Sequence, residues 1–167
     1  MTPEGWTAVG TLGLALLTLC LFIVTLYQVH LARKATGINL VLRLDGTFNG
    51  PELREARRRA AQALVNERYE EAEDVLDFFE TLAHLWKAGA VDATMVWHTF
   101  FHWEVAYFQL LNPYIRKKQE TEPDIYADLA GLNAKLVSLE AQRSGRRGAL
   151  DKEALQTFLD DEASLPG

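Results

Sequence analysis

Four side chains of this 167-residue chain have residue types and spacings that suit a metal ion. Glu80 and His84 are four residues apart, and so are His98 and His102, so each pair shares one face if its segment is helical. A turn at Gly89 separates the two segments, which predicts an antiparallel pair of helices with Glu80 beside His102 and His84 beside His98. Such convergent ligands, which are typical of metal sites in helical bundles, would bind zinc or another first-row metal and activate water.

The alternative is that these residues bind no metal. His84 falls on the same helical stripe as Glu73, Asp77 and Lys87, which is typical of a solvated face. Two histidines four residues apart also arise often in helices without a function. We therefore expect no cofactor, and we keep the divalent metal as the alternative.

Glu104 lies in the most aromatic segment of the chain, on the same helical face as Trp97 and Phe101. A buried carboxylate without a partner is costly, so it is either protonated or paired with a cation. The arginine-rich run 54–59 offers such cations. We predict that Glu104 takes part in a buried ion pair, with a structural role and not a catalytic one.

Established catalytic motifs are missing from the sequence. It contains no phosphate-binding loop, nucleophile elbow, zinc-protease helix or dinucleotide fingerprint. Its single cysteine, Cys20, excludes a disulfide framework and a cysteine-based zinc site. The net charge of −6 argues against a nucleic-acid partner. We expect no catalytic residues.

The segments that must position these side chains have helical periodicity. Pro51 suits a first helical position, Gly89 a helix stop, and Asp92 and Asp151 suit caps, whereas Pro113 should end or kink its helix. The segment after Asp92 is apolar on nearly all sides and should be central. Helices are expected over residues 51–68, 71–88, 92–111, 123–143 and 151–161. The prediction is an all-α fold, with a bundle of four to five helices over 51–143 and a linker and short helix over 144–167.

The N-terminal stretch Ala8–Val29 contains no charged side chain. Its 22 residues, as a helix, extend roughly 33 Å, which suffices to cross the hydrocarbon core of a bilayer. Trp6 and Tyr27 flank it, as interfacial aromatic residues do. We predict a single transmembrane anchor over 1–31, followed by a juxtamembrane helix and linker over 32–50.

Charges beside the stretch predict its orientation. Arg33 and Lys34 follow it directly, so the N-terminus should lie outside and the helical domain in the cytoplasm. Basic side chains near the membrane are candidates for contact with anionic lipids. These candidates are Arg33, Lys34, Arg54, Arg57 and Arg58.

One face of the predicted span carries small and hydroxyl side chains at a spacing of three to four residues, which is typical of helix–helix contact in membranes. This self-association face consists of Thr11, Ala15, Thr18, Phe22 and Thr25. The alternative is that each threonine hydroxyl bonds to its own helix and has no role in association.

Two short motifs carry a resemblance to a known family. They are Leu76-Asp77-Phe78-Phe79-Glu80 and Gly89-Ala90-Val91-Asp92, followed by Trp97 and Tyr107. With them, the region from Leu31 to Lys135 resembles an uncharacterised bacterial family, a domain of unknown function in small membrane proteins. The resemblance implies one N-terminal span, a helical cytoplasmic domain and the bacterial inner membrane. It implies no activity, cofactor or catalytic residue.

Together these features predict a membrane-anchored helical interaction or regulatory module without catalytic activity. It should self-associate or bind another membrane protein, within the lipid bilayer, and bind no nucleic acid. Two alternatives stay open. One is a metal-dependent hydrolase or oxidase built on Glu80, His84, His98 and His102. The other is a sensor that binds an apolar ligand among the aromatic side chains, which include Trp86, Trp97, Trp103, Tyr107 and Phe108.

Overall fold

The predicted all-α class is confirmed. The computed structural model describes residues 3–145 and 148–166, although within the first helix the side chains of 3–13, 15–16 and 33 are not described. This part of the chain contains helices and no strand. The elements are α1 (Pro3–Phe48), α2 (Pro51–Leu64), the 3-10 helix η1 (Tyr69–Ala72), α3 (Glu73–Lys87), α4 (Ala93–Gln119), α5 (Ala127–Ser144) and α6 (Lys152–Ala163). The chain divides into two compact units, Met1–Gly37 and Ile38–Gly167.

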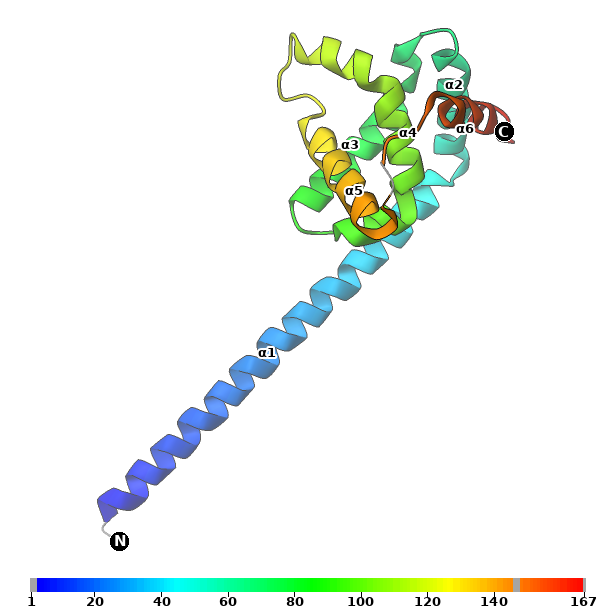
Figure 1. The fold of residues 1–167 in the computed structure, drawn as a ribbon. Coiled ribbons are helices and arrows are strands. Elements are labelled where there is room, and N and C mark those ends of the chain that lie inside the picture. The colour runs from blue at the N-terminus through cyan, green and yellow to red at the C-terminus, as the bar shows by residue number, and fades with distance from the viewer. Residues whose placement is uncertain (1–2, 146–147, 167) are drawn as a thin grey trace. The chain divides into compact units, whose positions relative to one another are not determined.

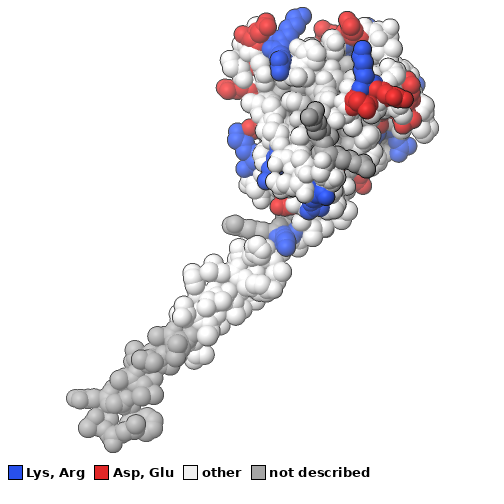
Figure 2. Space-filling model, viewed as in Figure 1, with Lys and Arg blue, Asp and Glu red and all other residues white. Residues whose placement is uncertain are grey.

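The first unit is the N-terminal part of α1. Its described side chains from 17 to 32 include no Lys, Arg, Asp or Glu (Figure 2). Large apolar side chains are exposed along it, at Leu14, Leu17, Leu19, Leu21, Phe22, Ile23, Val24, Leu26, Tyr27, Val29 and Leu31. The hydroxyls of Thr18 and Thr25 donate to the carbonyls of Leu14 and Leu21, each at 2.8 Å.

The predicted span falls only partly within the described side chains. Among these, no helix has an apolar run long enough to cross a membrane. Residues 8–13, 15 and 16 of the predicted span lie outside that set. Thr11 and Ala15 of the predicted self-association face lie outside it as well.

The second unit is a helical bundle around α4, which carries ten of its buried residues. The helix α5 packs against both α3 and α4, and α2 packs against α6 and η1 (Figure 1). Aromatic side chains join these helices at the centre. The ring of Phe48, at the end of α1, lies 5.1 Å from that of Phe78 and 5.6 Å from that of Phe100. The core therefore connects the end of α1 with α3 and α4.

The second helix is shorter than the sequence predicts and ends at Leu64. Glu67 adopts a left-handed conformation with φ of 56°. The amides of Glu67 and Arg68 then donate to the carbonyls of Leu64 and Ala63, at 3.1 and 3.0 Å. This arrangement pairs the last carbonyls of α2, as in a common type of helix end. The turn is stable because backbone groups satisfy one another, although the left-handed residue is not glycine.

The fourth helix continues to Gln119, so of the two predicted effects of Pro113, an end or a kink, the end does not occur. Pro113 lies on the exposed side of α4, where loss of one backbone hydrogen bond is tolerated. The next two residues, Tyr114 and Ile115, are buried. The Tyr114 hydroxyl donates to Glu73, and Lys118 forms an ion pair with Glu73 at 3.0 Å. Contacts with α3 therefore hold the last turns in helical form.

The predicted caps at Asp92 and Asp151 and the predicted helix stop at Gly89 are confirmed. The Asp92 carboxylate accepts a hydrogen bond from the Thr94 amide, and Asp151 accepts one from the Ala154 amide, each at 2.8 Å. Gly89 follows the end of α3 with a φ of +71°, a conformation that disfavours other residues. These caps fix where α4 and α6 begin.

Candidate functional site

A cluster of possible metal ligands lies between α3 and α5. Glu80 and His84 occupy successive turns of α3, and Asp128 lies in the first turn of α5. His84 Nδ1 is 2.6 Å from Asp128 Oδ2, and His84 Nε2 is 3.9 Å from Glu80 Oε1. One ligand atom from each residue lies within 4.8 Å of the others. The His84 side chain is 62% exposed, so solutes reach the cluster from solvent.

Charges around this cluster favour an ionised Asp128. The Lys87 ammonium lies 2.5 Å from Asp128 Oδ1, and this hydrogen bond lowers the pKa of the Asp128 carboxyl. Glu80 is more enclosed, and burial raises the pKa of its carboxyl although the Leu129 amide donates to it at 3.0 Å. Hydrogen bonds thus join Asp128, His84 and Lys87, and the Glu80 carboxyl lies 3.9 Å from the imidazole.

His98 and His102 do not join this cluster, which corrects the predicted set of four ligands. Arg143 donates to His98 Nε2 at 3.2 Å, and the His102 ring lies 5.5 Å from that of Phe158. Apolar faces bring α3 and α4 together instead, since the rings of Phe78 and Phe100 are 5.7 Å apart. The polar faces of the two helices consequently point elsewhere.

A buried ion pair joins α2 to α6. Arg57 and Glu162 are 3% and 4% exposed, and two guanidinium nitrogens of Arg57 donate to the two carboxylate oxygens at 2.5 and 2.7 Å. The Tyr107 hydroxyl and the Trp103 indole donate to the same carboxylate, at 2.8 and 3.1 Å. Arg57 also donates to the Phe48 carbonyl at 3.2 Å and lies over the Phe48 ring. Both charges are thus compensated and hydrogen-bonded, as buried pairs require.

This pair changes the role expected for the arginine-rich run. Arg57 is enclosed and held by Glu162, so it does not face a lipid surface. Arg58 pairs with Glu55 at 2.7 Å, and Arg54 donates to the Asn49 carbonyl at 2.6 Å. Arg33 lies outside the described side chains, and Lys34 is exposed.

The sequence prediction missed Glu162, yet a signal for it exists. Phe158, Leu159 and Glu162 share one face of α6, so a carboxylate occupies a side that is otherwise apolar. Arg57 likewise lies among alanines on the buried face of α2. A basic and an acidic residue on two apolar faces suggest a pair.

Glu104 is fully buried but forms no ion pair with any residue that the structure describes. The Asn133 side chain of α5 donates to Glu104 Oε2 at 3.1 Å. Glu104 Oε1 has no hydrogen-bond partner among the described residues. Burial raises the pKa of the Glu104 carboxyl from its ordinary value near 4.5 to about 8. The carboxyl is therefore mostly protonated at neutral pH, and the cation of the domain's buried pair serves Glu162 instead.

The aromatic side chains proposed as a ligand site pack against the hydrophobic core. Trp97 donates its indole N–H to Glu140 of α5 at 3.1 Å, as Trp103 does to Glu162 of α6. The Tyr107 ring lies 5.1 Å from that of Phe158. These contacts assign them a packing role between helices.

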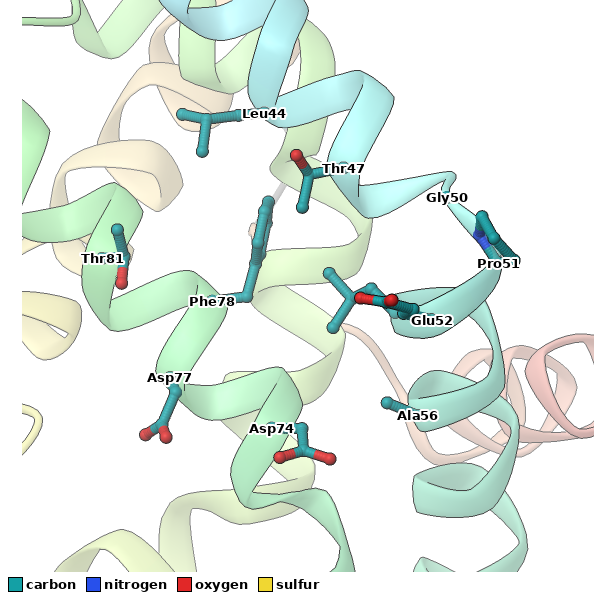
Figure 3. Close-up of a pocket in the computed structure, with 11 residues that line it drawn as sticks. Leu44, Thr47, Gly50, Pro51, Glu52, Ala56, Asp74, Asp77, Phe78 and Thr81 are labelled. Atoms are coloured by element: carbon teal, nitrogen blue, oxygen red, sulfur yellow. The ribbon is translucent and has the colours of Figure 1, made fainter.

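A groove of about 780 Å³ lies elsewhere, where the end of α1 and the start of α2 meet α3. Phe78 points from α3 toward Leu44 and Thr47 of α1, and the acidic side chains lie beside this apolar part (Figure 3). Its apolar lining residues are Leu44, Pro51, Leu53, Ala56 and Phe78, and its acidic ones are Glu52, Asp74 and Asp77. Burial and the neighbouring Glu73 and Asp74 raise the pKa of Asp77. The groove therefore combines apolar surface with negative charge.

The described fold is that of an all-α domain in which a central helix is enclosed by shorter ones. Residues 7–136 match the family described as a domain of unknown function, DUF4760, and the chain belongs to this family. A search of curated proteins and a search of solved structures each found no match. The match includes the Glu80–His84–Asp128 cluster and the groove, and it ends before α6.

Proposed function

We propose that the chain is a membrane-anchored helical interaction module that self-associates and has no chemistry of its own. The exposed apolar side chains of α1 from Leu14 to Leu31 carry this proposal. Apolar surface in water costs about 25 cal/mol for each Å², so a helix that exposes it on several sides is expected to be covered. We expect lipid chains and a second copy of the helix to bury this apolar surface.

The proposed location is the bacterial inner membrane, with the N-terminus outside and the bundle in the cytoplasm. Arg33 and Lys34 support this orientation, because basic residues flanking a span stay on the cytoplasmic side. In the proposed arrangement the helical unit is available to cytoplasmic partners.

Membrane anchoring is tested by expressing the full chain in a bacterium and washing its membranes with alkaline carbonate. The chain should stay in the membrane pellet. A Leu21→Arg/Val24→Arg variant should be released, because each arginine at the centre of a span costs about 2.5–3.5 kcal/mol.

The matched control is Leu42→Arg/Val65→Arg, which adds two charges at exposed positions outside the stretch. It should fractionate as the original chain does. Release of the original chain by carbonate, or equal retention of all three proteins, would reject anchoring through this stretch.

The groove is the place where we expect the partner to bind. Its apolar lining and its acidic residues Glu52, Asp74 and Asp77 are complementary to an amphipathic segment that carries Lys or Arg beside apolar side chains. The Arg59 side chain lies 3.5 Å from Asp74 and offsets only part of this charge.

A Leu/Lys amphipathic peptide, titrated by fluorescence anisotropy, tests this complementarity. We expect it to bind at least tenfold more tightly than a Leu/Glu peptide. Asp74→Asn/Asp77→Asn should remove most of that preference, whereas Glu120→Gln/Glu122→Gln, exposed and outside the groove, should keep it. An equal preference in both variants would show that overall charge, and not the groove, attracts the peptide.

A further inference from the structure

We propose that Glu80, His84 and Asp128 form a binding site for a divalent first-row transition metal ion such as Zn²⁺, which joins α3 to α5. The site goes beyond the interaction module, and it does not depend on the groove. It also differs from the four-ligand set expected from the sequence, because Asp128 takes the place of His98 and His102.

The distances suit such an ion. Zinc binds histidine nitrogen and carboxylate oxygen at about 2.0–2.2 Å, so neighbouring ligand atoms in a tetrahedral site lie roughly 3.3–3.5 Å apart. Here His84 Nδ1 lies 2.6 Å from Asp128 Oδ2, and the other ring nitrogen, Nε2, lies 3.9 Å from Glu80 Oε1. One ring nitrogen binds the ion, and one ligand atom from each residue lies within 4.8 Å of the others, so side-chain rotations must bring these three atoms closer together. Solvent supplies the fourth position, since His84 is exposed.

Neighbouring groups hold two of the ligands in place. The Leu129 amide donates to Glu80 Oε2, which leaves Oε1 facing His84. Lys87 donates to Asp128 Oδ1, which leaves Oδ2 facing His84. One oxygen of each carboxylate is thus anchored while the other points toward the imidazole, an arrangement in which outer groups orient metal ligands.

Lys87 also gives the proposal a sharp test. The Lys87 ammonium would repel a metal ion bound nearby. If no metal binds, Lys87 simply neutralises the Asp128 carboxylate in an ion pair. If the cluster is a metal site, removing Lys87 should tighten metal binding, because the loss of repulsion between the ammonium and the ion outweighs the loss of the hydrogen bond to Asp128 Oδ1. If the cluster is an ion-pair network alone, no stoichiometric binding should occur with or without Lys87.

The experiment is a calorimetric titration of the purified full chain, in detergent micelles, with ZnCl₂. We expect one Zn²⁺ for each chain. His84→Ala and Asp128→Asn should each weaken binding at least about tenfold, and Lys87→Met should strengthen it about threefold or more. His98→Ala is the matched control, since that histidine is also exposed but lies beside Arg143, and its affinity should equal that of the original chain.

Two further readouts keep the test decisive. CoCl₂ should give visible absorption bands that His84→Ala abolishes and His98→Ala retains. Excess ZnCl₂ should raise the Tm of the original chain by several degrees, because the ion binds only the folded arrangement of α3 and α5. Circular dichroism checks that each variant is folded. Absence of stoichiometric zinc binding, or an equal loss in His84→Ala and His98→Ala, would overturn the proposal.

Discussion

Glu104 and Glu162 are two carboxyl groups with almost no exposed surface, and they differ in how burial is compensated. Glu162 receives hydrogen bonds from Arg57, Tyr107 and Trp103. Glu104 receives one from Asn133, and its other oxygen lies without a partner in the described part of the chain. The two residues should therefore respond differently to substitution.

The Glu104 carboxyl should make stability depend on pH. Its folded pKa of about 8 exceeds the ordinary value of 4.5, so between these values the folded domain keeps a proton that the unfolded chain has released. The free energy of unfolding should therefore be highest below pH 4.5 for this group, and fall by roughly 4 kcal/mol as the pH rises to 8. Urea unfolding of the Glu104→Gln variant across this range should show a flatter dependence.

Glu120→Gln is the control for this measurement, because Glu120 is exposed at the end of α4. It should keep the pH dependence of the original chain. If Glu104→Gln keeps that dependence too, Glu104 is not the group that holds the proton.

The Arg57–Glu162 pair should show strong coupling. Arg57→Met leaves a buried carboxylate without its cation and should lower the free energy of unfolding by about 3–5 kcal/mol. The double variant Arg57→Met/Glu162→Met should regain at least about half of this loss, because no buried charge is left. Arg58→Met, which breaks the more exposed pair with Glu55, should cost less than about 1 kcal/mol.

Urea denaturation followed by circular dichroism gives these values as a double-mutant cycle. Additive losses from the two single substitutions would mean that the pair contributes no coupling. In that case the contact between α2 and α6 would depend on its apolar residues alone.

For individual residues, the sequence predicts that some charged side chains are buried, but not which side chains they pair with. Glu104 stood out because its neighbours are aromatic, and Arg57 because it lies in an arginine run. Their partners depend on which helix faces which, and Asn133 and Glu162 lie 29 and 105 residues away from them. Helical periodicity gives the buried face of each segment and carries no information on pairing over such distances.

At the scale of the elements, the short helix α6 supplies core contacts to two other helices. It is twelve residues long and lies outside the range that the family match covers. It nevertheless supplies Glu162 to the buried pair and places Phe158 against Tyr107 and His102. We infer that α6 completes the bundle in this chain.

Truncation after residue 150 should therefore destabilise the bundle. Arg57 loses its partner and Phe158 is lost from the core, so Tm should fall by roughly 10–20 °C. Truncation after residue 163 is the control and should lower Tm by only a few degrees. Calorimetry of both shortened chains measures the difference, and an equal Tm for the two would show that α6 does not stabilise the bundle.

The helices themselves were largely predictable, because caps, glycine and apolar stripes are local signals. Two features were not. Pro113 lies within a helix since contacts of Tyr114 and Lys118 with Glu73 outweigh the local preference. The prediction that the polar faces of α3 and α4 lie against each other was also wrong. Instead, α5 packs against both helices and places Asp128 beside His84. Both outcomes depend on tertiary contacts that the sequence order does not reveal.

At the scale of the whole molecule, self-association is the property that the proposed function most needs. Thr18 and Thr25 bond to carbonyls of their own helix, so their hydroxyls are not required to reach a second copy. Association through this face would then depend on close packing of small side chains.

Thr18→Val/Thr25→Val should accordingly change the dissociation constant of the oligomer less than about threefold, because valine keeps the shape of threonine. Thr18→Phe/Thr25→Phe should weaken association at least about tenfold, since bulky rings hold the helices apart. Sedimentation equilibrium in detergent provides both values. A loss in the valine variant as large as in the phenylalanine variant would instead assign hydrogen bonds between helices a central role.

The two indole hydrogen bonds described above have a practical consequence. Trp97 is joined to Glu140 on α5, and Trp103 to Glu162 on α6, so each indole senses a different helix. Replacing Trp6, Trp86 and one of these two with phenylalanine leaves the fluorescence of the remaining indole to report the departure of its own helix. The bundle thus contains native optical probes that can show whether α5 and α6 detach together or in sequence when a partner or an ion binds.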